Sequence, residues 1–254
     1  MTSVNITLGA RNGVVRDTWV ILRHNLRKTA RQKIALLFGA VQPLLFLLLF
    51  GPLLSGLGSW QMLVPGLLVQ LGLLSAGLAG FGIVFDARAG VLDRLRVSPT
   101  PRLALLLGQA LGGTAVLLLQ SALLVAVATA LGLRPPPLGL VLAAVLLAVT
   151  GTGLAAISNA LALVLDDAVF APVMTTVMVP LTLLSGAFLP MSMAPGWLNA
   201  LSAATPFRHT VEALRDLLAG DYLTPAVGLG TAVSVAFSVL CVALAVRIFN
   251  RLNA

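Results

Sequence analysis

Residues 138–165 read LGLVLAAVLLAVTGTGLAAISNALALVL, and this stretch contains no Asp, Glu, Lys or Arg. A helix of about 20 apolar residues crosses the roughly 30 Å hydrocarbon core of a bilayer. Because lipid offers the backbone no hydrogen-bond partners, only helices and closed barrels cross that core. The stretch therefore predicts a transmembrane helix.

Five further stretches share this character, and the charged residues gather in the gaps between them. The six predicted spans are 34–54, 61–85, 103–131, 138–165, 168–189 and 224–246. Hydrophobic residues make up 59% of the 254-residue chain and charged residues 9%, whereas soluble domains carry about 25% charged residues. The sequence thus predicts an all-α integral membrane protein, with residues 1–33 as a cytoplasmic N-terminal segment and 34–254 as a six-span transmembrane domain.

The basic residues are distributed unevenly between the two predicted sides of the membrane. Thirteen of the 16 Lys and Arg residues fall in the N-terminal segment, the gap after the second span and the C-terminal tail. By the positive-inside rule, this asymmetry predicts a multi-pass plasma (inner) membrane protein with both termini in the cytoplasm. Because these residues flank the spans, the net charge of +8 indicates topology and argues against nucleic acid as a partner.

Residues 12–31 have the pattern of an amphipathic helix lying on the membrane. Arg16, Arg23 and Arg27 share one face, whereas Trp19 belongs to an apolar stripe on another. Trp suits the bilayer interface, and Arg suits anionic headgroups. The alternative is a basic topology signal that happens to be helical.

The segment 184–222 is apolar in patches, but glycine and proline interrupt it too often for one straight helix. Thr205 before Pro206 is a good helix start, and Gly220 is a good stop. Between them an apolar stripe recurs at helical spacing: Phe207, Val211, Leu214 and Leu218. We expect a broken or re-entrant hairpin before the last span, followed by an amphipathic helix on the outer surface.

The gap 85–102 reads FDARAGVLDRLRVSPTPR. Gly90 interrupts the preceding helix, and residues 91–97 can form a short charged helix with Leu92 and Leu95 on one side. Ser98–Pro99 ends that helix. Such an element is suited to docking in a groove of a partner protein; the alternative is a solvated connecting loop.

The order and spacing of these motifs resemble the type-2 permeases of ATP-binding cassette (ABC) transporters, including those of the daunorubicin-resistance type. The resemblance rests on DARAGVLDRL at 86–95 with VSP at 97–99, LSGAFLP at 184–190, PGW at 195–197, and Thr205–Pro206. It extends to the N-terminal amphipathic helix, the six spans and the broken segment before the last.

The resemblance implies the permease subunit of an exporter whose energy comes from a separate ATPase subunit. No G-x-x-x-x-G-K-[ST] segment is present, and the only lysines are Lys28 and Lys33. We therefore expect no enzyme activity and no cofactor in this chain, with ATP and Mg bound by the partner. Function is expected to need a second permease subunit, either an identical copy or a related chain. The residues expected to couple to the ATPase are Asp86, Arg88, Gly90, Leu92, Asp93, Arg94 and Leu95.

Polar residues within the predicted spans are few, and six of them define a candidate substrate path. These are Gln42, Gln70, Gln120, Asn159, Thr175 and Thr176. The alternative for each is a hydrogen bond between helices. An interior so poor in charge suits a lipophilic or amphiphilic substrate such as a drug, natural product or lipid, and the family also includes glycan exporters.

Two other classes of function compete with the ABC permease. An ion-coupled secondary transporter usually carries an ionisable residue at membrane depth, but here the acidic residues lie in gaps or at span edges. An intramembrane enzyme needs clustered nucleophiles, bases or metal ligands. His24 and His209 lie far apart in the sequence with no such neighbours, so the sequence predicts no catalytic or metal site.

Overall fold

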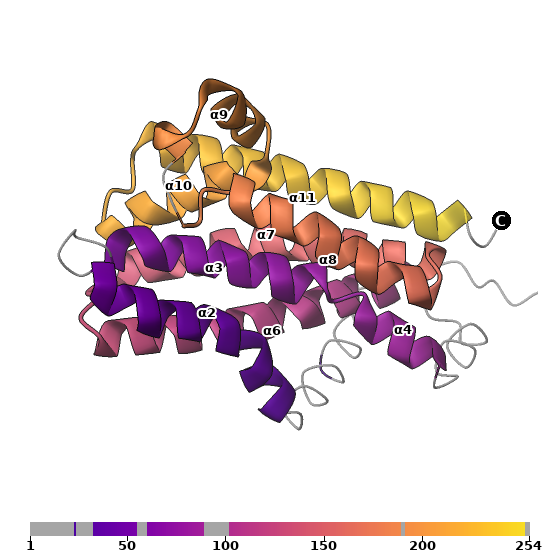
Figure 1. Cartoon of the computed structure of the whole chain (residues 1–254). Coiled ribbons are helices and arrows are strands. Elements are labelled where there is room, and N and C mark those ends of the chain that lie inside the picture. The colour runs from indigo at the N-terminus through magenta and orange to yellow at the C-terminus, as the bar shows by residue number, and fades with distance from the viewer. Residues whose placement is uncertain (1–22, 24–32, 55–59, 89–101, 189–190, 252–254) are drawn as a thin grey trace, which may run out of the picture.

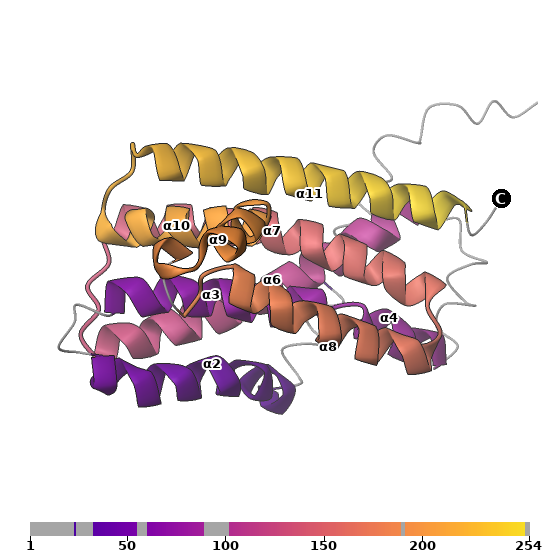
Figure 2. The ribbon, with the colours of Figure 1, turned by 45° about the horizontal axis from the view of Figure 1, so that its top comes forward.

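The computed structural model describes residues 23, 33–54, 60–88, 102–188 and 191–251, which contain helices and no strand. The long helices run side by side along a common direction (Figures 1 and 2). The elements are α2 (Lys33–Leu54), α3 (Trp60–Gly77), α4 (Phe81–Arg88), α6 (Arg102–Ala130), α7 (Pro137–Val164), α8 (Asp167–Leu184), the 3-10 helix η2 (Met191–Met193), α9 (Gly196–Ala203), α10 (Pro206–Ala219) and α11 (Pro225–Arg251).

Successive long helices alternate in direction, so their connections gather at two opposite ends of the bundle. One end, called here the Pro137 end, holds the α6–α7 and α10–α11 connections and the start of α3 (Figure 1). The other, called the Arg251 end, holds the end of α4, the α7–α8 connection and the end of α11 (Figure 1).

The prediction of an all-α membrane protein is confirmed, and each of the six predicted spans corresponds to helix. Among the described residues, four helical segments are long and apolar enough to cross a membrane: Trp60–Phe85, Leu107–Ala130, Pro137–Val164 and Pro225–Phe249. Shorter apolar helices cover Gly39–Gly51 and Ala168–Leu184. The count of six membrane crossings remains a prediction.

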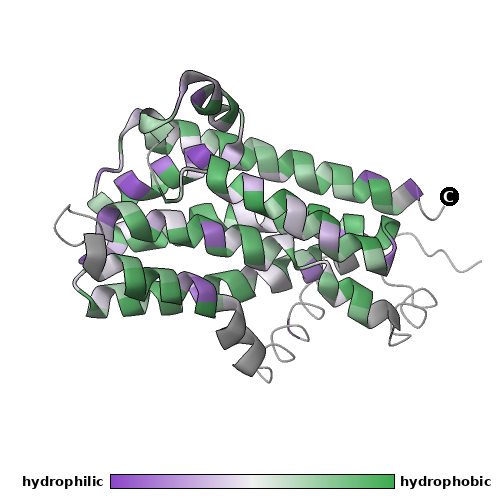
Figure 3. Cartoon of the chain, in the orientation of Figure 1, coloured by the Kyte–Doolittle hydropathy of each residue, from purple (hydrophilic) through white to green (hydrophobic). Residues whose placement is uncertain are grey.

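Apolar residues predominate along the long helices (Figure 3), as expected for helices in contact with lipid. Leu49, Val145 and Val239 are each more than half exposed in the isolated chain. The interior is held together by small residues that let helices approach closely. At Gly153 on α7, for example, an added Cβ would lie 2.6 Å from the Cα of Ser238 on α11.

The second predicted span differs from expectation because it is broken between α3 and α4. Hydropathy predicts one continuous helix over 61–85, but residues 78–80 form a turn. Four amides around it, those of Ala79, Phe81, Gly82 and Ile83, donate to the carbonyl three residues back instead of four. This is the hydrogen-bond pattern of a tight 3-10 turn. An apolar pattern cannot reveal such a break, because the residues on both sides of it remain apolar.

The fifth predicted span is shorter than expected. It ends at Leu184 because Gly186 takes a left-handed conformation, with φ of 70°. α8 occupies the Arg251 half of the bundle, and α10 occupies the Pro137 half (Figures 1 and 2). Between them, η2 and α9 form an excursion from the bundle. The segment is therefore broken, as predicted.

α10 begins and ends where the sequence predicts. Thr205 is the N-cap, Pro206 follows at the first helical position, and Gly220 ends the helix with a φ of 98°. The predicted apolar stripe is buried against α3, α7 and α11 and comprises Phe207, Val211, Leu214 and Leu218. Which side of the membrane α10 faces remains a prediction.

Candidate functional site

The predicted coupling segment starts where α4 ends. Asp86 and Arg88 lie in the last turn of α4, at the Arg251 end of the bundle (Figure 1). The other predicted coupling residues lie outside the described residues: Gly90, Leu92, Asp93, Arg94 and Leu95. The coupling role of the segment remains a prediction.

The predicted interfacial helix lies largely outside the described residues as well. Arg16, Trp19 and Arg27 are not described, whereas Arg23 is helical with an exposed side chain. The structure therefore leaves the interfacial helix as a prediction.

The six candidate path residues divide into two groups of three. Gln70 on α3, Gln120 on α6 and Asn159 on α7 are buried in the bundle, where no molecule outside the chain reaches them in this conformation. Gln42 on α2 and the pair Thr175 and Thr176 on α8 are exposed. The structure thus brings no continuous path together from these six residues within one chain.

The exposed face of α8 carries polar groups in an otherwise apolar setting. Thr175 Oγ1 donates to the carbonyl oxygens of Ala171 at 2.9 Å and Pro172 at 3.1 Å, and Thr176 is its exposed neighbour. Pro172 and Pro180 are exposed too, and each lacks the amide hydrogen that would bond the carbonyl four residues earlier. Hydroxyls and unbonded carbonyls exposed to lipid cost free energy unless protein or water covers them.

The interior polar groups act mainly between helices. Thr114 and Thr152 share a hydrogen bond of 3.0 Å between α6 and α7, and Thr210 and Ser234 share one of 3.0 Å between α10 and α11. Gln120 packs directly against Gly39 of α2. Asn159 is 1% exposed, and neither of its side-chain amide atoms has a hydrogen-bond partner among the residues that the structure describes.

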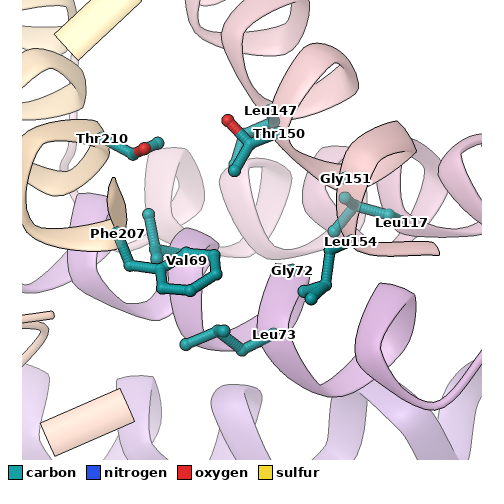
Figure 4. A pocket seen from close by; sticks show the side chains of 10 residues that line it. All are labelled: Val69, Gly72, Leu73, Leu117, Leu147, Thr150, Gly151, Leu154, Phe207 and Thr210. Atoms are coloured by element: carbon teal, nitrogen blue, oxygen red, sulfur yellow. The ribbon is translucent and has the colours of Figure 1, made fainter. Parts of the chain in front are cut away.

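A small cavity lies between α3, α6, α7 and α10 (Figure 4). Its wall is apolar apart from two hydroxyls, of Thr150 and Thr210, and Phe207 lies beside Val69 along it (Figure 4). The cavity measures about 10 Å³, room for about one water molecule. Sites that enclose drug-sized ligands measure about 300–1,000 Å³, so this cavity is too small to hold such a molecule in this conformation.

Charged groups tie α10 to the broken segment before it. Arg208 Nε donates to Glu212 Oε1 at 2.9 Å, and its guanidinium also bonds Asn199 on α9. Arg215 Nη2 donates to the carbonyl of Gly186 at 2.8 Å, next to the end of α8. The described residues include no group of three His, Cys, Asp or Glu side chains that could hold a metal ion.

Ser158 on α7 is a polar span residue that is not among the candidate path residues, and it is 1% exposed. Its hydroxyl contacts the main chain at the break between α3 and α4, at Gly77 and Gly80. The available signal in the sequence was the pair of small residues Ala76 and Gly80, because their small-xxx-small spacing marks a close helix contact. The pattern gave no indication of which helix supplies the contact.

Comparison with known proteins supports a single family. The family model described as ABC-2 type transporter matches residues 16–219. The putative transport permease ycf38 of Cyanophora paradoxa is 28% identical over 215 residues, which cover 80% of this chain and 74% of that protein. The daunorubicin resistance ABC transporter permease protein DrrB1 of Streptomyces coeruleorubidus is 30% identical over 223 residues, covering 84% and 79%.

Proposed function

This chain belongs to the ABC-2 type transporter family and is a multi-pass transmembrane permease, and we propose that it exports a lipophilic or amphiphilic substrate using ATP hydrolysed by a separate subunit. The observation that carries the proposal is the family match along most of an apolar helical bundle. The relative named for daunorubicin resistance makes a planar, amphiphilic drug the first substrate to test.

The proposed energy source is a partner ATPase. The sequence contains no phosphate-binding loop of the G-x-x-x-x-G-K-[ST] type. The partner would supply ATP and Mg, and the segment 86–102 would receive its movement. α4 supports this assignment because it leads directly from the bundle into that segment.

The proposed route for the substrate runs along the exposed face of α8, between two permease subunits. The small cavity within the chain cannot hold a drug-sized molecule, so a route outside the single bundle is favoured. Thr175 and Thr176 offer hydroxyls on a face that lipid alone would leave poorly solvated. A second permease subunit facing α8, whether identical or related, would cover these groups.

Efflux from cells tests this proposal. The chain is co-expressed with a candidate ABC ATPase subunit, and the loss of preloaded daunorubicin is followed by the fluorescence of the drug. We expect faster loss than in cells that carry the same ATPase with its phosphate-binding lysine replaced by alanine. If daunorubicin and every member of a panel of lipophilic cations and lipids are lost at the same rate with the active and the inactive ATPase, the proposed substrate class is contradicted.

A further inference from the structure

The break between α3 and α4 leaves two main-chain groups without helical partners at a depth where lipid supplies none. The amide of Phe81 donates to Leu78, so the carbonyl of Gly77 receives no bond from four residues on. The amide of Gly80 finds no helical acceptor. The Ser158 hydroxyl of α7 serves both, because it donates to the Gly77 carbonyl at 2.5 Å and accepts from the Gly80 amide at 3.1 Å.

An added Cβ at either glycine would meet a neighbouring helix, at the main chain beside Gly80 and at the flexible end of Met178 beside Gly77. A Cβ on Gly80 would lie 2.5 Å from the carbonyl oxygen of Ser158, and one on Gly77 would lie 2.7 Å from Met178 Sδ of α8. Phe81, the first residue of α4, stacks edge to face on Phe170 of α8, with ring centroids 5.1 Å apart. The break is thus the point where the second span meets α7 and α8 together.

We propose that this break is a pivot within the second span. Ser158 is the positioning residue, and its hydroxyl, called here the latch, holds the two sides of the break in place. A 3-10 stretch inside a helix often marks a hinge. Here a single hydroxyl bonds one amide and one carbonyl that the 3-10 turn leaves without a main-chain partner. When α4 tilts, the latch passes the movement to α7, and Phe81 passes it to α8. The link to transport rests on the proposed function, because it takes α4 to be moved through the segment 86–102.

Distances between spin labels test the pivot directly in the purified chain in lipid nanodiscs, with Cys241 replaced by alanine. One pair, Phe85→Cys with Leu244→Cys, relates α4 to α11. A second pair, Gln61→Cys with Leu229→Cys, relates α3 to the other end of α11. All four positions are exposed. Each pair thus reports one side of the break against the same reference helix.

We expect Ser158→Ala to widen or shift the Phe85–Leu244 distance distribution and to leave the Gln61–Leu229 distribution unchanged. Ser158→Thr, which keeps the hydroxyl, should restore the wild-type distribution. Thr150→Val is the matched control, because it removes a buried hydroxyl of α7 that bonds only the Leu146 carbonyl of its own helix, at 2.9 Å. Thr150→Val should leave both distance distributions unchanged.

If both distance distributions are unchanged in Ser158→Ala, the proposed role of Ser158 as the latch is overturned. If both distributions change equally, the bundle has loosened as a whole, and the pivot is overturned. If Ser158→Ala does not fold, the wild-type complex with its ATPase is measured with and without ATP. The pivot then requires a shift at Phe85–Leu244 that is absent at Gln61–Leu229. A lack of ATPase-dependent transport of daunorubicin and of the other lipophilic compounds by the wild type would refute the proposed function while leaving the distance test of the pivot intact.

Discussion

At the scale of single residues, Gly153 shows how the bundle depends on positions that carry no side chain. The Cβ of an alanine there would lie 2.6 Å from the Cα of Ser238, and a main-chain neighbour cannot move aside cheaply. We expect Gly153→Ala to destabilise the protein by about 1–3 kcal/mol, the usual cost of overpacking. Thermal unfolding in detergent, read as the loss of monodisperse protein, measures the effect.

Gly228 supplies the matched control for Gly153. It is also helical, but an added Cβ would meet no atom within 4 Å. Because alanine favours the helix over glycine by about 1 kcal/mol, Gly228→Ala should keep or raise the unfolding temperature. The packing account fails if the two variants unfold at the same temperature.

At the scale of elements, the sequence predicts where the long helices lie because their apolar runs are bounded by charge, glycine and proline. It also predicts α10, since one face of that helix is apolar and the other carries Arg208, Glu212 and Arg215. It does not predict the break at residues 78–80. The partner that makes the break tolerable, Ser158, comes from a helix almost eighty residues later.

The candidate path could be predicted only in part for a related reason. α2, α6, α7 and α8 carry apolar residues on every face, so the sequence does not distinguish a face in contact with lipid from a face in contact with protein. Tertiary packing alone separates buried Gln70 and Asn159 from exposed Gln42, Thr175 and Thr176. The role of these residues in transport remains a prediction.

The segment after α4 carries the testable prediction at the scale of elements. Exchanging its charges, with Asp93→Arg and Arg94→Asp together, should lower transport, because losing one partner of a buried interfacial charge pair costs about 2–5 kcal/mol. Membrane insertion should persist, since the residues lie outside the predicted spans. Transport at matched expression with the ATPase present gives the result. A wild-type rate together with unchanged co-purification of the ATPase would leave the coupling role without support.

At the scale of the whole molecule, the alternating helices and the 13-to-3 distribution of basic residues define a testable topology. With Cys241 replaced by alanine, we expect a cysteine at Arg94 to be protected from an impermeant thiol reagent added to intact cells. A cysteine at Asp221, exposed at the Pro137 end beyond α10, should react. Labelling of position 94 from outside intact cells would reverse the assigned orientation. Permeabilised cells serve as the control, because the cysteine at position 94 should react there.

The central claim is that this permease transports its substrate only when a separate subunit hydrolyses ATP. The most direct measurement reconstitutes the purified chain into liposomes with and without its purified ATPase, and records ATP hydrolysis and daunorubicin movement together. We predict no ATP hydrolysis by the chain alone, and ATP-dependent daunorubicin movement only when both proteins are present. ATP hydrolysis by the chain after every co-purifying ATPase has been removed, or transport driven by an ion gradient without ATP, would contradict the account.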